Sequence, residues 1–302
     1  MKNKAQFIGN WKKNYVLFLF LLPALIYVAI FAYAPMYGLL LAFKNYRTNL
    51  GIWHSPWVGL KHFIRFLEYP DTWNMVRNTL SISLYQMLVF PIPAIFALMI
   101  NELRNDRVKR SVQMITYSPH FISTVVLGSM ILLFFNRSSG LVNNIIEALG
   151  GKRIDFLSLP ESFYSMYVWS GVWQNLGWDA IIYLAALSGV SRDCVEAAQI
   201  DGASRLKIIR HVNLPHIIPT IVIVFILQMG QILNVGFEKI MLLQNPMNLD
   251  VSQVISIYVY EIGVQGAQFS YSTAIGLLNN IVNVTLVLFV NWIAKRVGDT
   301  GL

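Results

Sequence analysis

Residues 194–215 read CVEAAQIDGASRLKIIRHVNLP and lie between two long apolar segments. Glu-Ala-Ala at 196–198 is typical of a short helix, and Gly202 permits a sharp backbone turn after it. Asp201 or Ser204 could then cap a second short helix. The pattern predicts two short helices that meet at a glycine and form a compact, protruding elbow.

Six long apolar runs surround this loop and dominate the composition of the chain. Of its 302 residues, 56% are apolar and 13% charged, against typical values of roughly 45–50% and 25% in soluble domains. Each run exceeds the ~20 residues that cross a hydrocarbon layer of ~30 Å as a helix. The runs are residues 14–43, 78–101, 111–136, 162–191, 212–237 and 262–294. They predict a polytopic membrane protein and exclude an ordinary cytosolic enzyme.

The six runs are expected to be helices, because no ten-residue alternating pattern of barrel strands recurs. The predicted fold class is therefore an all-α integral membrane protein with six transmembrane helices. With both termini inside, 14 of the 23 Lys and Arg residues lie on cytoplasmic segments, which favours an N-in, C-in orientation. The predicted organisation is a cytoplasmic tail 1–13, a membrane domain 14–294 and a cytoplasmic tail 295–302. The first run is too long for the core of a signal peptide and is expected to remain as the first helix.

Residues for catalysis or metal binding do not form a recognisable pattern. The single cysteine, Cys194, permits no internal disulfide and is expected to be a small packing residue. The five histidines are too dispersed or out of helical phase for a metal cluster, and His120 is expected near the membrane interface. No Ser/His/Asp order and no pair of carboxylates occurs within one span. The net charge of +8 is explained by membrane orientation without invoking nucleic acid.

The loop at 194–215 resembles the "EAA" loop of type I ABC importer permeases. Ile209 is a departure, because sugar-importer permeases often have an aromatic residue there. The resemblance implies a type I permease fold in which the loop (about 192–215) forms a coupling helix, inserts into a cleft of a cytoplasmic ATPase and transmits its closure to the membrane helices. The residues that carry the resemblance are Glu196, Ala197, Ala198, Asp201, Gly202, Ala203, Leu214 and Pro215.

The same resemblance implies a multi-subunit importer in the plasma membrane. The chain has no Gly-x-x-x-x-Gly-Lys-Ser/Thr sequence, and the nearest piece, at 150–153, lacks the hydroxyl residue. ATP and Mg are therefore expected on a separate chain, and no cofactor is expected on this one. The implied partners are a second, non-identical permease, two cytoplasmic ATPase subunits, an extracellular solute-binding protein and membrane lipid.

Weaker similarities extend over nearly the whole chain and suggest a substrate. The segments 58–63 and 77–80, together with Pro119, resemble the carbohydrate branch of maltose-type permeases. The segment 22–44 resembles permeases for oligo- and polysaccharides in Gram-positive bacteria. The implied substrate is an oligosaccharide or polysaccharide fragment, such as one from alginate, rhamnogalacturonan or a host glycan, and the implied mechanism is alternating access.

Polar residues inside the spans are costly and are candidates for function. In the run 162–191, Asn175, Asp179 and Tyr183 recur every four residues and share one helix face, with Trp178 beside them. A carboxylate can accept hydrogen bonds from sugar hydroxyls, and an aromatic ring can stack on a sugar. The alternative is that Asp179 pairs with another helix while the tryptophans lie in the interfacial belt.

Two later runs carry amide side chains. Gln228, Gln231 and Asn234 would form one polar stripe on a helix, which either lines the path or makes hydrogen bonds between helices. For Asn279, Asn280 and Asn283, hydrogen bonding between helices is the favoured interpretation. The predicted substrate path comprises Asn175, Trp178, Asp179, Tyr183, Gln228, Gln231 and Asn234.

Other classes of protein remain as alternatives to a sugar importer. One is an ABC importer permease for another solute, and another is an ion-coupled secondary sugar transporter. Secondary carriers also bury carboxylates, but most have more spans and internal repeats, and none needs the loop at 194–215. An integral membrane enzyme is disfavoured because no catalytic arrangement is found.

Overall fold

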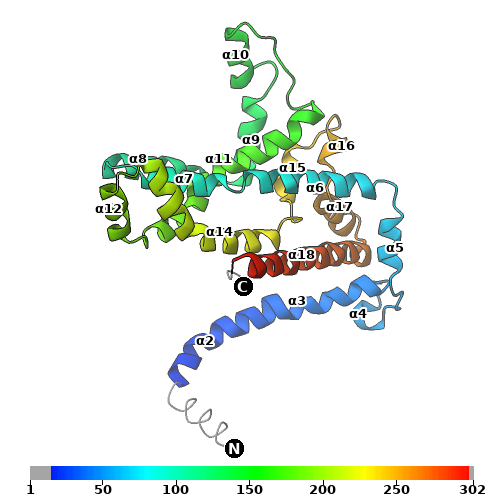
Figure 1. The fold of residues 1–302 in the computed structure, drawn as a ribbon. Helices are drawn as coiled ribbons and strands as arrows, with labels where there is room; N and C mark the ends of the chain where they lie inside the picture. The colour runs from blue at the N-terminus through cyan, green and yellow to red at the C-terminus, as the bar shows by residue number, and fades with distance from the viewer. Residues whose placement is uncertain (1–14, 299–302) are drawn as a thin grey trace, which may run out of the picture. The chain divides into compact units, whose positions relative to one another are not determined.

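The computed structural model describes residues 15–298, and within this range the chain is helical apart from loops and one isolated β-bridge. The predicted all-α class is confirmed for this range. The tail 1–13, Asn14 and residues 299–302 lie outside the described residues. The elements in chain order (Figure 1) are α2 (Tyr15–Val28), η1 (Ala29–Tyr33), α3 (Ala34–Met36), η2 (Tyr37–Phe43), α4 (Gly51–His54), α5 (Lys61–Leu67), α6 (Thr72–Val89), α7 (Ile92–Asn101), α8 (Asp106–Tyr117), η3 (Ser118–Phe121), α9 (Thr124–Phe134), α10 (Leu141–Ala148), α11 (Pro160–Leu187), α12 (Arg192–Ile200), α13 (Arg205–Ile208), η4 (Ile209–Asn213), α14 (Leu214–Met229), α15 (Phe237–Leu243), α16 (Leu249–Ser252), α17 (Ile255–Tyr260), η5 (Glu261–Gln265) and α18 (Phe269–Gly298).

Between residues 15 and 298, four helical stretches are long and apolar enough to cross a membrane, and a fifth qualifies if a bent pair is one span. The four are Tyr15–Phe43, Thr72–Asn101, Arg205–Met229 and Phe269–Arg296. The bent pair is Asp106–Phe121 with Thr124–Phe134, at 99° to each other. The remaining predicted span corresponds to α11, which has 28 residues but is too rich in polar and aromatic side chains to meet the same criterion. By length and composition the chain is therefore a multi-pass membrane protein.

Two helices begin earlier than the apolar runs predicted. The second starts at Thr72 and the fifth at Arg205. Basic residues, Arg77 in the second and Arg210 in the fifth, lie within the first two turns of these helices, and counting from the last charge missed those turns. The fifth helix contains the π-helical turn η4 directly before α14. Pro215 was expected in a first helical turn but lies about ten residues inside the continuous helix. A wider π turn relieves the clash that a proline ring makes with the preceding turn.

The predicted third and sixth spans are not straight, continuous helices. In the third, η3 contains Pro119, and Ser123 begins α9 by accepting a hydrogen bond from Val126 N at 3.3 Å. The break follows from the missing N–H of proline and from the new cap. In the sixth, η5 ends at Gln265 and the chain reverses at Ala267, whose φ is +51°. The sixth long helix therefore begins at Phe269 and not at residue 262.

The chain divides into two compact units. The first comprises the described residues up to Leu67 together with Ile262–Leu277. In it the Lys44 ammonium donates to the carbonyls of Ile52 and Trp53 at 2.8 and 3.0 Å, which pins the loop that follows the first long helix. Arg65, on α5, lies over the ring of Tyr271 at 4.0 Å, so α5 packs against the start of α18.

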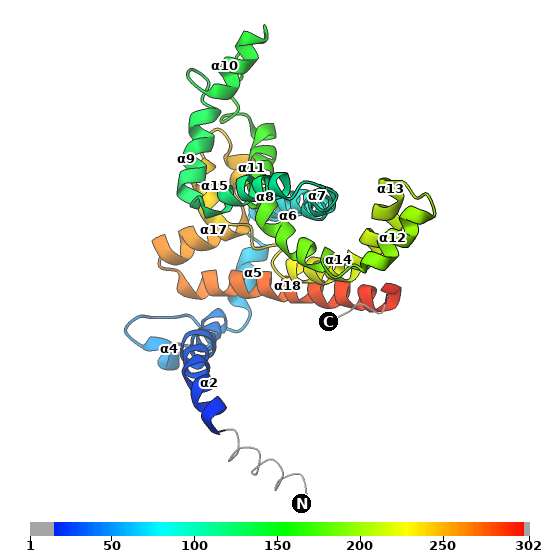
Figure 2. The same cartoon turned by 90° about the vertical axis from the view of Figure 1, so that its left-hand side faces the viewer.

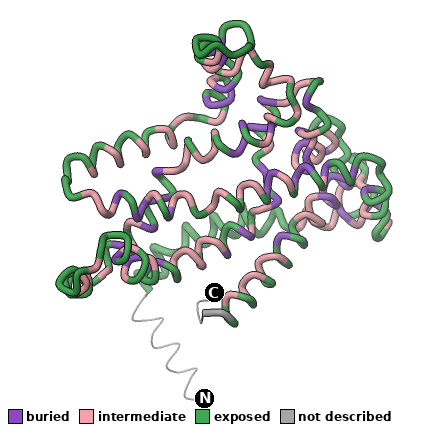
Figure 3. Tube along the Cα trace, turned by 45° about the horizontal axis from the view of Figure 1, so that its top comes forward, coloured by how far each residue is buried: buried purple, intermediate pink, exposed green. Residues whose placement is uncertain are grey.

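The second unit comprises Glu68–Glu261 and the rest of α18, and its central element is α11. This helix packs against α6, α7, α8, α9 and α14, and Figure 3 shows that buried and exposed positions alternate along such helices. Gly177 lets α11 approach α8 closely, because a Cβ there would lie 2.4 Å from the Thr116 carbonyl oxygen. Two pieces project from this packing: α10 beyond the ends of α9 and α11, and the α12–α13 elbow beside α14 (Figure 2).

Candidate functional site

A cavity of about 560 Å³ lies among α6, α7, α11 and α14. It combines apolar walls with amide, carboxylate, phenol and indole groups, most of them from α11. Its lining residues are Gln86, Val89, Phe90, Pro93, Val168, Gly171, Val172, Asn175, Leu176, Trp178, Asp179, Ile182, Tyr183, Val224, Leu227 and Gln228. An apolar cavity with a few convergent polar groups is the usual form of a small-molecule site.

Five of the seven residues predicted for the substrate path line this cavity: Asn175, Trp178, Asp179, Tyr183 and Gln228. The four-residue spacing on α11 accounts for the shared face, and α14 presents Gln228 to it. Asp179 is exposed to the cavity, and in the part of the chain that the structure describes its carboxylate accepts no hydrogen bond. The carboxylate is therefore free to accept hydrogen bonds from a ligand.

The remaining two path residues lie elsewhere, because α14 ends at Met229. The predicted stripe required a helix that continued to Asn234, so the prediction of one stripe on helix five is wrong. Asn234 instead accepts hydrogen bonds from Asn279 at 3.0 Å and Asn283 at 3.4 Å, and donates to Gln231 at 2.7 Å. This amide cluster joins the chain after α14 to α18, in agreement with the hydrogen-bonding interpretation for Asn279 and Asn283.

His120 is a neighbour of the cavity that the sequence did not identify. Its ring stacks on Trp178 with centroids 4.3 Å apart and planes 4° from parallel. Its Nδ1 lies 2.9 Å from Asn175 Oδ1. Because Asn175 Nδ2 donates to the Gly171 carbonyl, Oδ1 is the acceptor and the ring N–H donates. The bend between α8 and α9 thus fixes two of the cavity side chains.

Gln86 was also missed, although the sequence carried a signal for it. It is an amide within the second apolar run, and the criterion that selected Gln228 would have selected it.

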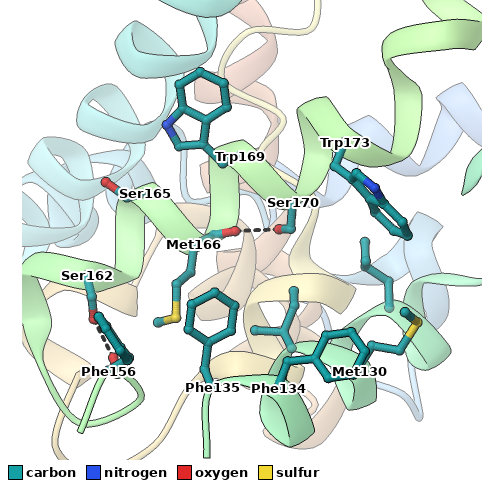
Figure 4. A pocket seen from close by; sticks show the side chains of 12 residues that line it. Met130, Phe134, Phe135, Phe156, Ser162, Ser165, Met166, Trp169, Ser170 and Trp173 are labelled. Atoms are coloured by element: carbon teal, nitrogen blue, oxygen red, sulfur yellow. Dashed lines mark hydrogen bonds between the residues drawn. The ribbon is translucent and has the colours of Figure 1, made fainter. Parts of the chain in front are cut away.

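A second cavity, of about 590 Å³, lies between α9 and α11 and differs in chemistry (Figure 4). Its walls are mainly aromatic rings and methionines, with three serines. Ser170 donates its hydroxyl hydrogen to the Met166 carbonyl, and Ser162 donates to the Phe156 carbonyl. The hydroxyl groups of these two serines are therefore already hydrogen-bonded to backbone carbonyls, and this cavity is a poorer candidate for a polar ligand than the first one.

The predicted elbow is present in the structure. The first helix, α12, covers Glu196, Ala197 and Ala198, and Gly202 has φ +75°. Gly202 N donates to Gln199 O at 3.0 Å and Ala203 N donates to Ala198 O at 2.9 Å. These two bonds form a Schellman motif, in which glycine adopts the left-handed conformation after a helix.

The second helix of the elbow, α13, follows Ser204. Ser204 occupies the N-cap position, but its side chain makes no capping hydrogen bond. The expected side-chain cap from this residue is therefore absent.

The outer surface of the elbow is exposed and partly apolar. Ile200 is 86% exposed and Leu206 74% exposed, while Glu196, Asp201 and Pro215 are also exposed. Cys194 is exposed on α12, so the expectation that it is a packing residue is wrong. Exposed apolar side chains on a rigid protrusion are typical of a protein-binding surface.

Packed side chains connect the elbow to the cavity. Asn213, buried at the start of α14, donates to the Glu102 carboxylate at 3.1 Å, next to the end of α7. A buried apolar cluster then joins α7, α11 and α14. Its members are Ala94, Ala97, Leu98, Ala180, Tyr183, Leu187 and Ile217, and Tyr183 also lines the cavity.

Comparison with known proteins identifies the family. A model of the family described as "Binding-protein-dependent transport system inner membrane component" matches residues 89–299. The chain belongs to this family. It is an ABC transporter permease and not an enzyme, since the ATPase of such transporters is a separate subunit.

Two relatives from Bacillus subtilis (strain 168) are similar over nearly their whole length. The chain is 41% identical to protein LplB over 96% of this chain and 92% of LplB. It is 41% identical to the polygalacturonan/rhamnogalacturonan transport system permease protein YteP over 100% of this chain and 94% of YteP.

Among solved structures, this chain resembles a chain of a bacterial ABC transporter involved in the import of the acidic polysaccharide alginate. The TM-score is 0.89 at 38% identity, and the alignment covers 97% of this chain and 99% of that chain. The same agreement is found with the alginate transporter in complex with a pentasaccharide-bound periplasmic protein.

Proposed function

We propose that this permease imports an acidic oligosaccharide or polysaccharide fragment, and that the cavity among α6, α7, α11 and α14 is part of its path. The observation that carries the proposal is the grouping of Asn175, Trp178, Asp179 and Gln228 around one cavity. The relatives add the substrate class, since polygalacturonan is a polymer of uronic acids and alginate is an acidic polysaccharide.

The cavity residues have distinct roles in this proposal. Asp179 accepts hydrogen bonds from sugar hydroxyls, and charge-assisted bonds of this kind are stronger than neutral ones. The amides of Asn175 and Gln228 can both donate and accept. Trp178, held by the stacked His120 ring, offers a face to the C–H groups of a sugar.

The complete importer contains further subunits. A second, similar permease completes the path, two ATPase subunits bind ATP and Mg on the cytoplasmic side, and an external solute-binding protein delivers the sugar. This chain holds no cofactor of its own. It crosses the plasma membrane six times with both termini inside, α11 being the fourth crossing, and its tails are residues 1–13 and 295–302.

Transport follows from movement of the elbow. Closure of the ATPase pair displaces α12 and α13, with Glu196, Ala197, Ala198, Asp201, Gly202, Ala203, Leu214 and Pro215 forming the coupling loop. Because α13, η4 and α14 are continuous, the displacement reaches Gln228 at the cavity. The two access states then differ in the orientation of α14 against α11, and ligand and nucleotide bias their populations.

Uptake and assembly measured together test the proposal. Asp179→Asn keeps the shape and should weaken sugar uptake moderately, whereas Asp179→Leu should weaken it severely, because an apolar group cannot replace the lost acceptor. Trp178→Ala should act in the same direction, while nucleotide-driven movement of the ATPases persists. Asp106→Asn, at the exposed start of α8, is the matched control.

A purely structural role for Asp179 gives a different pattern. Asp179→Leu would then lower the yield or thermal stability of the assembled complex, and Trp178→Ala would change little. Normal uptake by all three variants at normal yield would remove α11 from the substrate path.

A further inference from the structure

A lysine lies buried behind one residue of the cavity wall. Lys239, on α15, is 8% exposed. Its ammonium donates to the Tyr167 carbonyl at 2.6 Å and lies 4.6 Å from the centre of the Tyr167 ring. The Tyr167 hydroxyl in turn accepts a hydrogen bond from Gly236 N at 3.1 Å. The position of the ammonium is therefore fixed by α11 and by the start of α15.

This ammonium has no anionic partner within the described residues. In the part of the chain from residue 15 to 298, the one ion pair is between Arg153 and Glu147. An ammonium has three N–H donors, and the described residues accept from one of them. Buried charges are normally paired, because removing an ion from water costs several kcal/mol. An unpaired one inside a membrane protein is a candidate for binding an ion or a charged ligand.

A glycine of the cavity wall lies beside this lysine, which is not itself one of the lining residues. Gly171 lines the cavity, and a Cβ built on it would lie 3.5 Å from Lys239 Nζ. A wall residue beside the ammonium therefore has no side chain to cover it. Along the same face of α11, Asp179 follows eight residues later, which is ~12 Å at 1.5 Å per residue. A cation beside the cavity wall and a carboxylate in that wall thus lie at two separate positions along α11.

We propose that Lys239, reached past Gly171, is the group that recognises the carboxylate of a uronic acid residue in the translocation path. This inference rests on the proposed function and adds the basis of selection for acidic over neutral sugars. The Lys239 end takes the carboxylate of one sugar unit, while Asp179, ~12 Å beyond Gly171 along the axis of α11, takes hydroxyl groups of a unit further along the glycan. This axial separation keeps the two like charges, those of Asp179 and of the substrate carboxylate, apart.

The test compares charged and neutral forms of one substrate. The complete importer, in proteoliposomes with its binding protein, is supplied with oligogalacturonate and with the same fragments methyl-esterified. For each form the uptake of a variant is divided by that of the wild type, so that the preference of the binding protein cancels. The variants are Lys239→Met, Lys239→Arg and Gly171→Val, and the control is Lys152→Met, which removes an exposed lysine. The yield of assembled complex is measured for each.

Lys239→Met is expected to lower uptake of the charged form by about tenfold or more, as loss of a charge-assisted hydrogen bond implies, and uptake of the ester by less than about twofold. Lys239→Arg should keep most uptake of the charged form. Gly171→Val, which leaves the lysine in place but covers it, should resemble Lys239→Met. The control should leave both ratios near one.

If Lys239→Met lowers uptake of the charged and esterified forms equally, or if its loss of uptake follows the complex yield, the inference is overturned and the proposed function stands. The inference is likewise overturned if Lys239→Met takes up the charged form as well as the wild type does, or if Lys239→Arg and Lys239→Met lose uptake of the charged form equally. A wild-type importer that moves neither form, nor an alginate oligosaccharide, would overturn the proposed function, and the inference with it.

Discussion

Gly202 gives a prediction that separates backbone conformation from steric fit at the elbow. Its φ is +75°, in the left-handed region, and a Cβ added to it would meet no atom within 4 Å. The chain itself therefore has room for a side chain. What excludes most residues is the conformation, which costs roughly 1–2 kcal/mol for an ordinary L-residue and less for asparagine.

The expected order of activity follows from these two observations. A cost of 1–2 kcal/mol lowers the population of the correct elbow by a factor of about 5–30. Gly202→Asn should keep most coupling and Gly202→Ala should lose about fivefold. Gly202→Val should lose the most, because a β-branched residue fits this region worst.

The assay is ATP hydrolysis by the assembled transporter when loaded binding protein is added, with uptake measured in parallel. Complex yield serves as the control for insertion and assembly. If Gly202→Ala proved more active than Gly202→Asn, the size of the side chain in the partner groove would matter more than the backbone. Full coupling by Gly202→Val would refute the assignment of the elbow as the coupling element.

Three further results are expected. Gly177→Ala should destabilise the protein by about 1–3 kcal/mol, because the new Cβ would meet the Thr116 carbonyl at 2.4 Å, whereas Gly276→Ala, with open space around it, should not lower the melting temperature. The hydrogen bond and charge of Arg153 lower the pKa of Glu147 below its usual 4.5. The Arg153–Glu147 pair therefore stabilises α10 fully above the pKa that Glu147 has in the unfolded chain, and this stabilisation is lost as pH falls through the lower pKa of the folded state. Hydrogen exchange in α10 should report this loss, and Glu147→Gln should abolish the pH dependence. The isolated chain in detergent should show only background ATP hydrolysis, and turnover above that level would contradict a separate ATPase.

The elbow could be predicted from sequence because its determinants are local. A helix-forming Glu-Ala-Ala, a glycine and a following serine lie within nine residues, and the Schellman bonds join residues five or fewer apart. The face of α11 was predictable for the same reason, since a four-residue spacing places Asn175 and Asp179 on one side of any helix.

Features that depend on tertiary contacts were missed or misjudged. The prediction of a continuous stripe of amide side chains was wrong because nothing in the apolar run 212–237 indicated that α14 ends at Met229. His120 was overlooked because its role depends on a 99° bend that brings its ring onto a helix more than fifty residues away. No sequence pattern indicated that Lys239 lies beside the cavity wall, since its place next to α11 is fixed by packing and not by spacing.

The low apolarity of α11 is itself consistent with its place in the structure. A helix that faces lipid on most sides must be apolar, because unpaired polar groups in hydrocarbon cost several kcal/mol. This helix carries asparagine, aspartate, glutamine and three tryptophans between residues 169 and 179, yet it is the element against which α6, α7, α8, α9 and α14 pack. Its polar face lines a cavity and its opposite face lines the apolar one, so neighbouring helices shield much of it from lipid. The least apolar of the predicted spans is therefore the one that lines the proposed substrate cavity.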